Sequence, residues 1–108
     1  MTHPSPPNAA PWPHDHVPTE FQRAVVTALR QLPAGELVTY GELADEIGRP
    51  GAGQAVANVL RRAPDVPWWR VIPSDGRLYC SHAPVQAPLL EADGHRVDEE
   101  RRVDPTAG

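Results

Sequence analysis

The 108-residue sequence contains one cysteine, a small fraction of aromatic residues and no long apolar run. The single cysteine, Cys80, excludes an internal disulfide. No segment approaches the roughly 18 consecutive apolar residues that span a membrane. The segment MTHPSPPNAAPWPHDHVP lacks the basic start and the apolar stretch of a secretory signal. These absences predict one small cytoplasmic domain whose core is only marginally stable.

The formal net charge of −4 argues against a nonspecific nucleic-acid-binding protein, because such proteins are usually basic. The charge is unevenly distributed, however. Residues 49–70 contain four arginines and one acidic residue, whereas residues 91–104 contain six acidic residues. The sum over the whole chain therefore hides a basic middle segment.

The first 18 residues contain six prolines and little periodic apolar pattern, which predicts a mobile tail. Three histidines in this tail, His3, His14 and His16, raise the question of a metal site. Nothing in the sequence fixes their geometry, so we predict no metal there. Trp12 has two possible positions, docked on the domain or exposed to solvent.

Two capping boxes predict the starts of helices. Thr19 and Gln22 have the spacing of the first box, and Thr39 and Glu42 have the spacing of the second. Gly48 suits the left-handed position just beyond the second helix. Apolar residues at helical spacing follow each box, namely Phe21, Val25, Ala28, Leu29 and Leu32 in the first helix and Leu43, Ala44 and Ile47 in the second.

A third helix is predicted from about Ala52 to Arg62, and Pro64 stops it. Together with the short second helix and the glycine-containing turn before it, this helix forms a candidate helix-turn-helix. The nearby arginines favour contact with nucleic acid, but ordinary helix packing explains the same spacing. One face of the third helix is expected to be apolar, with Ala52, Ala55, Val56, Val59 and Leu60.

Beyond Pro67, the sequence predicts a small wing and one more helix. Asp75-Gly76 between apolar runs is typical of a hairpin or a tight turn. Pro88 is expected in the first turn of the last helix, with Leu89, Leu90 and Ala92 following. Gly94 is expected to end this helix, and residues 98–108 are polar enough to be frayed.

Four motifs in this order resemble the DNA-binding domain of O6-alkylguanine-DNA alkyltransferases: VTYGELA, GRPGAGQAV, PWWRVIPSDG and LLEADGHRV. The resemblance covers about residues 19–97. It implies a mainly α, winged helix-turn-helix domain with a short hairpin or wing, like the C-terminal domain of those enzymes. It also implies that the recognition helix enters the minor groove. We therefore predict a tail at 1–18, this domain at 19–97, and a frayed acidic tail at 98–108.

The central motif of that family is proline-cysteine-histidine-arginine-valine, and its cysteine takes the alkyl group from O6 of a flipped guanine. Here Trp68 stands at the cysteine and Trp69 at the histidine. The reaction needs a thiolate activated by a base, and an indole is neither. The chain therefore resembles the alkyltransferase-like proteins, which bind alkylated DNA without repairing it. Their usual motif keeps the histidine, so the hydrogen bonding of that histidine is expected to be lost here.

The resemblance also implies roles for single residues. Tyr40 matches a tyrosine that helps to rotate the phosphate 3′ of the lesion, although it could instead be a core residue. Gln54 matches an arginine that fills the gap in the base stack, and a glutamine can still bond the orphaned base without charge assistance. Arg61 and Arg62 either contact phosphates or stabilise the helix end. The predicted lesion pocket contains Tyr40, Trp68, Trp69 and Arg70, and the predicted DNA contacts are Thr39, Tyr40, Ala52, Gln54, Ala55, Asn58, Arg61 and Arg62.

Three residues near the motif are expected to be structural. Arg70 should pair with backbone or with a carboxylate beneath the pocket. Trp69 is assigned a packing role. Cys80 lies beyond the motif and is expected to be a small, inert hydrophobic residue.

These observations predict a damage sensor that flips an O6-alkylated guanine out of duplex DNA, with no enzymatic activity, cofactor or metal. It is expected to be a monomer that marks the lesion for nucleotide excision repair proteins, without membrane contact. Three alternatives remain: an alkyltransferase that uses Cys80, a helix-turn-helix regulator without lesion preference, and a degenerate interaction module.

Overall fold

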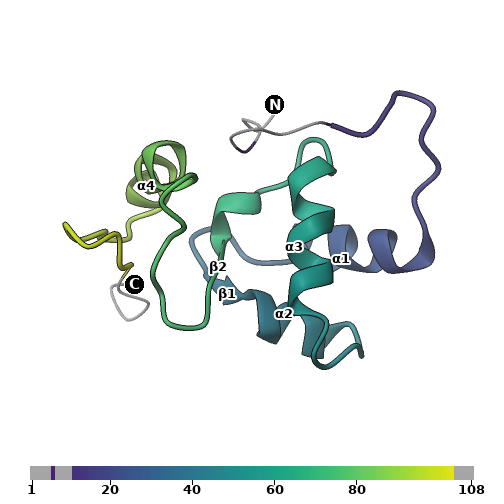
Figure 1. Ribbon diagram of the computed structural model, residues 1–108, viewed down its shortest axis with the longest axis horizontal. Helices are drawn as coiled ribbons and strands as arrows, with labels where there is room; N and C mark the ends of the chain where they lie inside the picture. Colours follow the sequence, from purple (N-terminus) through teal and green to yellow (C-terminus); the bar gives the residue numbers. More distant parts are fainter. Residues whose placement is uncertain (1–5, 7–10, 104–108) are drawn as a thin grey trace.

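The computed structural model describes residue 6 and residues 11–103. Most of the regular structure is helical, which confirms the predicted mainly α class, and Figure 1 shows the helices arranged around a small central pair of strands. The elements in chain order are α1 (Glu20–Arg30), β1 (Val38–Thr39), α2 (Tyr40–Glu46), α3 (Gly53–Arg62), the 3-10 helix η1 (Trp68–Arg70), β2 (Val71–Ile72) and α4 (Ala83–Ala92).

Both predicted capping boxes are present. The Thr19 hydroxyl accepts from Gln22 N at 3.1 Å, while Gln22 Oε1 accepts from Thr19 N at 2.9 Å. Thr39 and Glu42 make the same reciprocal pair at 3.0 and 2.9 Å. Each box satisfies backbone donors that the first turn of a helix leaves without partners. Gly48 has a φ of +76°, as predicted for the residue that leads the chain away from α2.

The helix-turn-helix consists of α2 and α3, which pack against each other and against α1. The two helices approach closely at Gly53, where an added Cβ would lie 3.6 Å from backbone atoms of Tyr40 and Gly41. That distance is an ordinary van der Waals contact, so the first residue of α3 lies directly against the start of α2. This contact places Tyr40 beside the predicted recognition helix.

The two strands pair in parallel, with Val38 opposite Val71 and Thr39 opposite Ile72. The predicted turn at Asp75-Gly76 does form, since Gly76 N donates to Pro73 O at 2.9 Å. The chain after this turn does not pair with β2 as it would in a simple hairpin. Arg77 instead forms an antiparallel β-bridge with the distant Arg102.

The last helix begins earlier than the sequence predicts. α4 starts at Ala83, so Pro84 occupies its first turn and Pro88 lies in its interior. The predicted position of Pro88 in the first turn is therefore wrong. Pro84 already provides the fixed φ that suits a helix start, and the helix continues past Pro88 without its N–H. The predicted end is correct, since Asp93 caps the helix and Gly94 has a φ of +96°.

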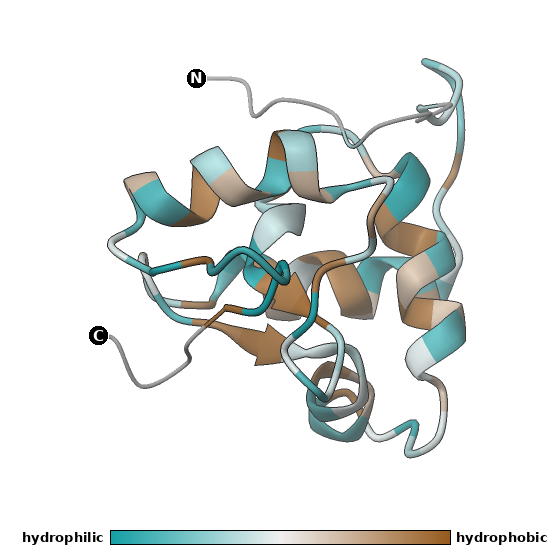
Figure 2. Ribbon diagram, turned by 60° about the vertical axis from the view of Figure 1, so that its left-hand side comes forward, coloured by the Kyte–Doolittle hydropathy of each residue, from teal (hydrophilic) through white to brown (hydrophobic). Residues whose placement is uncertain are grey.

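The core lies between the helices and the strand pair, and Figure 2 shows the strands and the inner sides of the helices in the hydrophobic colour. Trp68 and Trp69 belong to this core, with 5% and 6% of their surface exposed. The largest fully buried side chains are Leu29, Leu43, Leu78, Leu90, Val25, Val56, Val66, Val71 and Val103.

The segments outside the central domain contain more contacts than their composition predicts. Trp12 is docked: its backbone N–H donates to Arg62 O at 3.0 Å, and its ring stacks on His16 with centroids 4.6 Å apart. At the other end, Val97 forms an antiparallel β-bridge with Val103, and Val103 is buried. The prediction that the chain is frayed from residue 98 is therefore wrong for residues 98–103. His3 and residues 104–108 lie outside the described residues.

Candidate nucleic-acid interface

The exposed side of α3 carries a stripe of polar and small residues. Gln54 and Asn58 lie one turn apart, and Gln54 Nε2 approaches Asn58 Oδ1 at 3.4 Å. Ala55 was expected on the apolar face but is exposed, because Val56, Val59 and Leu60 are enough to fill the buried side. Five predicted DNA-contacting residues therefore share the solvent-facing side of one helix: Gln54, Ala55, Asn58, Arg61 and Arg62.

A pocket of about 370 Å³ opens beside this stripe. It brings together α3, the start of α2, η1 and the loop before α4. Tyr40 and Trp68, both predicted for the lesion pocket, line it. The complete lining is Pro6, Tyr40, Gln54, Ala57, Leu60, Arg61, Trp68, Tyr79, Cys80, Ser81 and His82.

Four rings form a connected wall of this pocket. The centroids of Tyr40 and Tyr79 are 6.2 Å apart, those of Tyr79 and His82 are 5.6 Å apart, and those of His82 and Trp68 are 5.8 Å apart. All three pairs are tilted, an arrangement that aromatic side chains favour over face-to-face stacking. The wall therefore offers ring faces and edges on which a planar base can pack.

Tyr40 and His82, two of the rings in this wall, are neutral near neutral pH. Burial, with a smaller contribution from Tyr79, raises the pKa of Tyr40 to about 12 against the opposing effect of Arg61. The Tyr40 hydroxyl therefore keeps its proton and remains a hydrogen-bond donor. Burial, together with Arg61, lowers the pKa of His82.

Trp69 and Arg70 lie outside the pocket lining and meet Asp93 at the end of α4. Trp69 Nε1 donates to Asp93 Oδ2 at 3.0 Å. Arg70 Nε and Nη2 donate to the two oxygens of the same carboxylate at 2.8 and 3.1 Å. The prediction that Arg70 pairs with a carboxylate is confirmed, but the purely packing role of Trp69 is wrong, because its indole N–H reaches this carboxylate.

The Arg70 hydrogen bonds are the largest influence on Asp93 and hold its pKa below the usual range, despite partial burial. The Trp69 hydrogen bond acts in the same direction. Asp93 is therefore ionised at neutral pH, and its pair with Arg70 is mostly screened from solvent, since each side chain is only 15% exposed.

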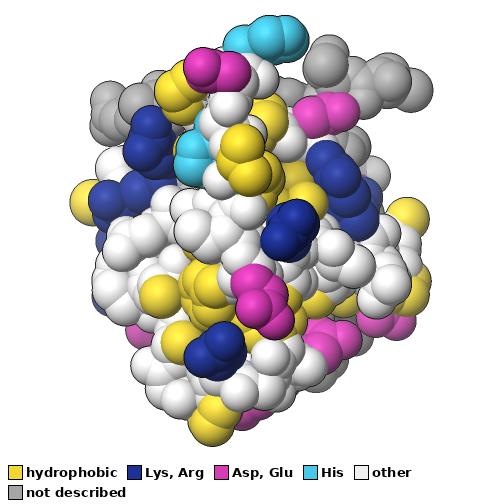
Figure 3. All heavy atoms as spheres, turned by 90° about the vertical axis from the view of Figure 1, so that its right-hand side faces the viewer, with side chains coloured by type: hydrophobic (Ala, Val, Ile, Leu, Met, Phe, Trp, Pro, Cys, Tyr) yellow, Lys and Arg dark blue, Asp and Glu magenta, His cyan; other side chains and the backbone are white. Residues whose placement is uncertain are grey.

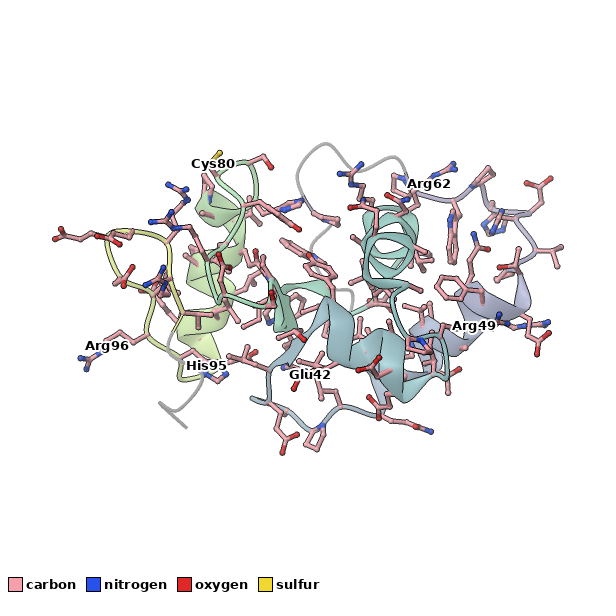
Figure 4. All side chains as sticks on the ribbon, turned by 60° about the horizontal axis from the view of Figure 1, so that its bottom comes forward. Glu42, Arg49, Arg62, Cys80, His95 and Arg96 are labelled. Carbon is pink, nitrogen blue, oxygen red and sulfur yellow. The ribbon has the colours of Figure 1, made fainter. Side chains whose placement is uncertain are left out.

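Sequence reasoning missed the contribution of residues 79–82 to the pocket. These residues form an irregular loop, and no periodicity or motif marks them. Cys80 was expected to be an inert hydrophobic residue, but it is exposed and lies on the pocket lining. Figure 4 shows Cys80 and Arg62 on the same upper edge of the molecule, whereas Glu42, His95 and Arg96 lie lower down.

The remaining predicted DNA contacts, Thr39 and Ala52 among them, are not part of the lining of this pocket. Thr39 caps α2 and Ala52 precedes α3, so both lie at the entrances of the two helices. Figure 3 shows basic side chains grouped at the upper left edge, beside a histidine.

Within the described residues, no cluster of His, Cys, Asp or Glu is arranged to hold a metal ion. The same part of the chain has no helix long and apolar enough to cross a membrane.

Residues 20–95 match the family described as the 6-O-methylguanine DNA methyltransferase DNA-binding domain. The chain belongs to this family. The resemblance seen in the four sequence motifs is therefore confirmed, and the winged helix-turn-helix class is confirmed with it.

Relatives within this family include both named enzymes and named binding proteins. The chain is 43% identical over 81 residues to a methylated-DNA–protein-cysteine methyltransferase of Methanosarcina acetivorans, and it spans 52% of that protein. It is 34% identical over 85 residues to a DNA base-flipping protein of Vibrio parahaemolyticus, and it spans 85% of that protein. The crystal structure of the S. pombe ATL in complex with DNA matches 82% of this chain and 90% of its own, at 27% identity and a TM-score of 0.70.

Proposed function

We propose that this protein binds O6-alkylguanine in duplex DNA by flipping the damaged base into the aromatic pocket, without removing the alkyl group. The observation that carries the proposal is Trp68, a buried indole on the wall of a pocket that opens beside the exposed side of α3. Membership of the family supports contact with DNA. The complex would then mark the lesion for nucleotide excision repair.

The pocket suits a flipped base for physical reasons. Extrusion of a base from a duplex costs a few kcal/mol, and less where pairing is already weakened. Stacking on an aromatic side chain returns about 1–3 kcal/mol per base. The wall formed by Tyr40, Trp68, Tyr79 and His82 supplies such surfaces. An alkylated guanine, which pairs poorly, is thus favoured over an intact one.

The exposed side of α3 suits the minor groove. Gln54 and Asn58 provide amide donors and acceptors, and Arg61 and Arg62 provide charge at the end of the helix. Ala55 keeps the stripe narrow, which allows the helix to approach the groove floor. Phosphate contacts hold a protein in register, while contacts with base edges distinguish one site from another.

The proposed absence of transfer follows from the chemistry at position 68. An indole has no thiolate with which to attack an alkyl carbon, and Trp69 provides no base. The carboxylate that Trp69 contacts, Asp93, is already engaged by Arg70. Trp68 is therefore assigned to packing against the alkyl group and the base.

A fluorescence anisotropy titration with two duplexes tests this function. The duplexes are identical except for one O6-methylguanine in place of guanine, and the ionic strength is stated and fixed, because DNA affinity depends on salt. Tighter binding of the damaged duplex is expected. Equal affinity for both duplexes refutes the proposal and favours a regulator without lesion preference, and no binding of either favours an interaction module.

A second candidate, alkyl transfer to Cys80, is favoured by the position of this thiol on the lining of the same pocket. In such a reaction the sulfur would displace guanine O6 from the alkyl carbon, leaving guanine and a thioether. Incubation with the damaged duplex, followed by mass measurement of the intact protein, tests it. A gain of one methyl group that disappears in Cys80→Ser establishes transfer, and an unchanged mass excludes it.

A further inference from the structure

Trp69 and Arg70 are anchored to one carboxylate. Asp93 Oδ2 accepts from both Trp69 Nε1 and Arg70 Nε, while Oδ1 accepts from Arg70 Nη2. Both oxygens are thus engaged by donors from η1, the segment that also carries Trp68. Hydrogen bonds of this charge-assisted, bidentate type are strong and impose a defined geometry.

The carboxylate is itself held in place by α4. Asp93 caps this helix, and its backbone N–H donates to Leu90 O at 3.0 Å. The buried Gln86 of the same helix donates to the carbonyl oxygens of Trp69 at 3.0 Å and of Val71 at 3.3 Å. α4 therefore fixes η1 twice, through the backbone and through the indole of Trp69.

The anchored indole in turn contacts Trp68. The two rings meet edge to face, with centroids 6.3 Å apart and planes at 89°. The guanidinium of Arg70 lies 5.3 Å from the centroid of the Trp69 ring and limits its rotation further. An edge-to-face contact depends on the mutual orientation of the rings, so the angle of Trp68 in the pocket depends on that of Trp69.

We propose that Trp69 is a positioning residue: its indole N–H, anchored on Asp93, fixes the orientation of Trp68 and thereby sets the discrimination between alkylated and intact guanine. This inference rests on the proposed function, because it assigns Trp68 to the damaged base. It predicts that the ring N–H at position 69 matters more than the size of the ring. Histidine, which stands at this position in the motif of the family that the chain resembles, also has a ring N–H. It should therefore be able to take over the positioning role of Trp69.

Two matched variants separate the hydrogen bond from the packing. Both are made in a Trp12→Phe background, so that Trp68 is the only tryptophan left. Trp69→Phe keeps an aromatic ring and removes the donor, whereas Trp69→His keeps a donor on a smaller ring. Time-resolved fluorescence anisotropy of the free proteins reports the motion of Trp68. Titration with the damaged and intact duplexes gives the ratio of their dissociation constants.

Trp69→Phe is expected to free the motion of Trp68 and to lower the discrimination ratio about tenfold, which corresponds to about 1.4 kcal/mol. Trp69→His is expected to restrict that motion again and to keep the ratio high. The proposal is overturned if Trp68 moves no more freely in Trp69→Phe than in Trp69→His. It is also overturned if the discrimination ratio of Trp69→Phe equals that of the background protein, or if the ratio of Trp69→His falls as far as that of Trp69→Phe. If the unsubstituted protein binds both duplexes equally, the proposed function fails, while the motion of Trp68 still decides the positioning role.

A measurement on the unsubstituted protein covers the case in which Trp69→Phe does not fold. The indole N–H signal of Trp69 in a 1H–15N NMR spectrum can be assigned by comparison with Trp12→Phe and Trp68→Phe. Slow exchange of this proton with solvent is expected from its bond to Asp93. Exchange as fast as that of an exposed indole overturns the proposal.

Discussion

The imidazole of His82 lies against the indole of Trp68, with ring centroids 5.8 Å apart and planes inclined by 50°. The contact joins the loop before α4 to η1 and closes one side of the pocket. Burial and Arg61 lower the pKa of His82, so the ring is neutral at neutral pH. The pocket therefore combines a neutral aromatic wall with a cationic rim, an arrangement suited to a base and its phosphates.

Trp68→Ala is expected to weaken binding of the damaged duplex about 5- to 150-fold, the range that corresponds to a lost stacking contribution of about 1–3 kcal/mol. Binding of the intact duplex should change much less. Anisotropy titrations measure both, and Trp12→Phe is the control for loss of a tryptophan outside the pocket. Because Trp68 is buried, thermal denaturation must first show that the variant is folded. An equal loss on both duplexes contradicts the assignment.

Tyr40→Phe removes one hydroxyl and leaves the ring in place. If the hydroxyl donates to a phosphate, the affinity for damaged and intact duplexes should fall together, by about tenfold. The loss should also be independent of pH between about 6 and 9, because the pKa of Tyr40 is about 12. Titrations at three pH values measure this. A loss confined to the damaged duplex would place the hydroxyl on the base instead.

Arg61→Gln and Arg62→Gln should each reduce the salt dependence of DNA binding by about one unit of log affinity per log salt concentration. The reason is that each arginine in contact with a phosphate releases about one counterion. Arg96→Gln is the matched control, since Arg96 is exposed away from the edge that carries Arg62 in Figure 4. An unchanged slope for Arg61→Gln or Arg62→Gln would mean that this arginine only stabilises the end of α3.

Gln54→Arg is expected to raise the affinity for duplex DNA, because it adds charge at the exposed start of α3 and allows charge-assisted hydrogen bonds in the groove. The salt dependence should become steeper by about one unit. The same titrations measure both quantities, and Gln54→Lys separates charge from the geometry of the guanidinium. A weaker or unchanged affinity would show that Gln54 lies outside the groove.

Acidification should destabilise the protein in two steps. The folded-state pKa of His82 is lowered, so the unfolded chain takes up its proton more readily, and stability falls as the pH drops below about 6.5. The folded-state pKa of Asp93 is also lowered, so its contribution is present above about pH 3.9 and is lost below that value. Urea denaturation as a function of pH measures both steps. His82→Gln should remove the first step, and a variant that retains it would assign that step to another group.

The helices were predictable because their signals are local. Each capping box lies within four consecutive residues, and the structure reproduces both. The exposed side of α3 follows from helical periodicity, except that Ala55 is small enough to suit either side. Pro88 misled the prediction because a proline is tolerated in a first turn and costly in an interior, and Pro84 was available for that role.

The pocket and the strand pair were not predictable because they depend on distant partners. The two strands contain two residues each, too few to show any alternation. The role of Trp69 needed Asp93, which follows it by 24 positions, and the place of Cys80 needed the path of an irregular loop. The resemblance identified the residues at the centre of the site, but the contacts around them came only from the fold.

The parallel pairing of β1 with β2 has a consequence for folding. Tyr40 directly follows β1 and η1 directly precedes β2, so the pairing of these distant strands helps to bring Tyr40 and Trp68 to the same pocket. Closing such a loop carries an entropic cost that nearby contacts cannot offset. We therefore expect the pocket to form after the local helical contacts, so that a partly folded chain would have helices but no pocket.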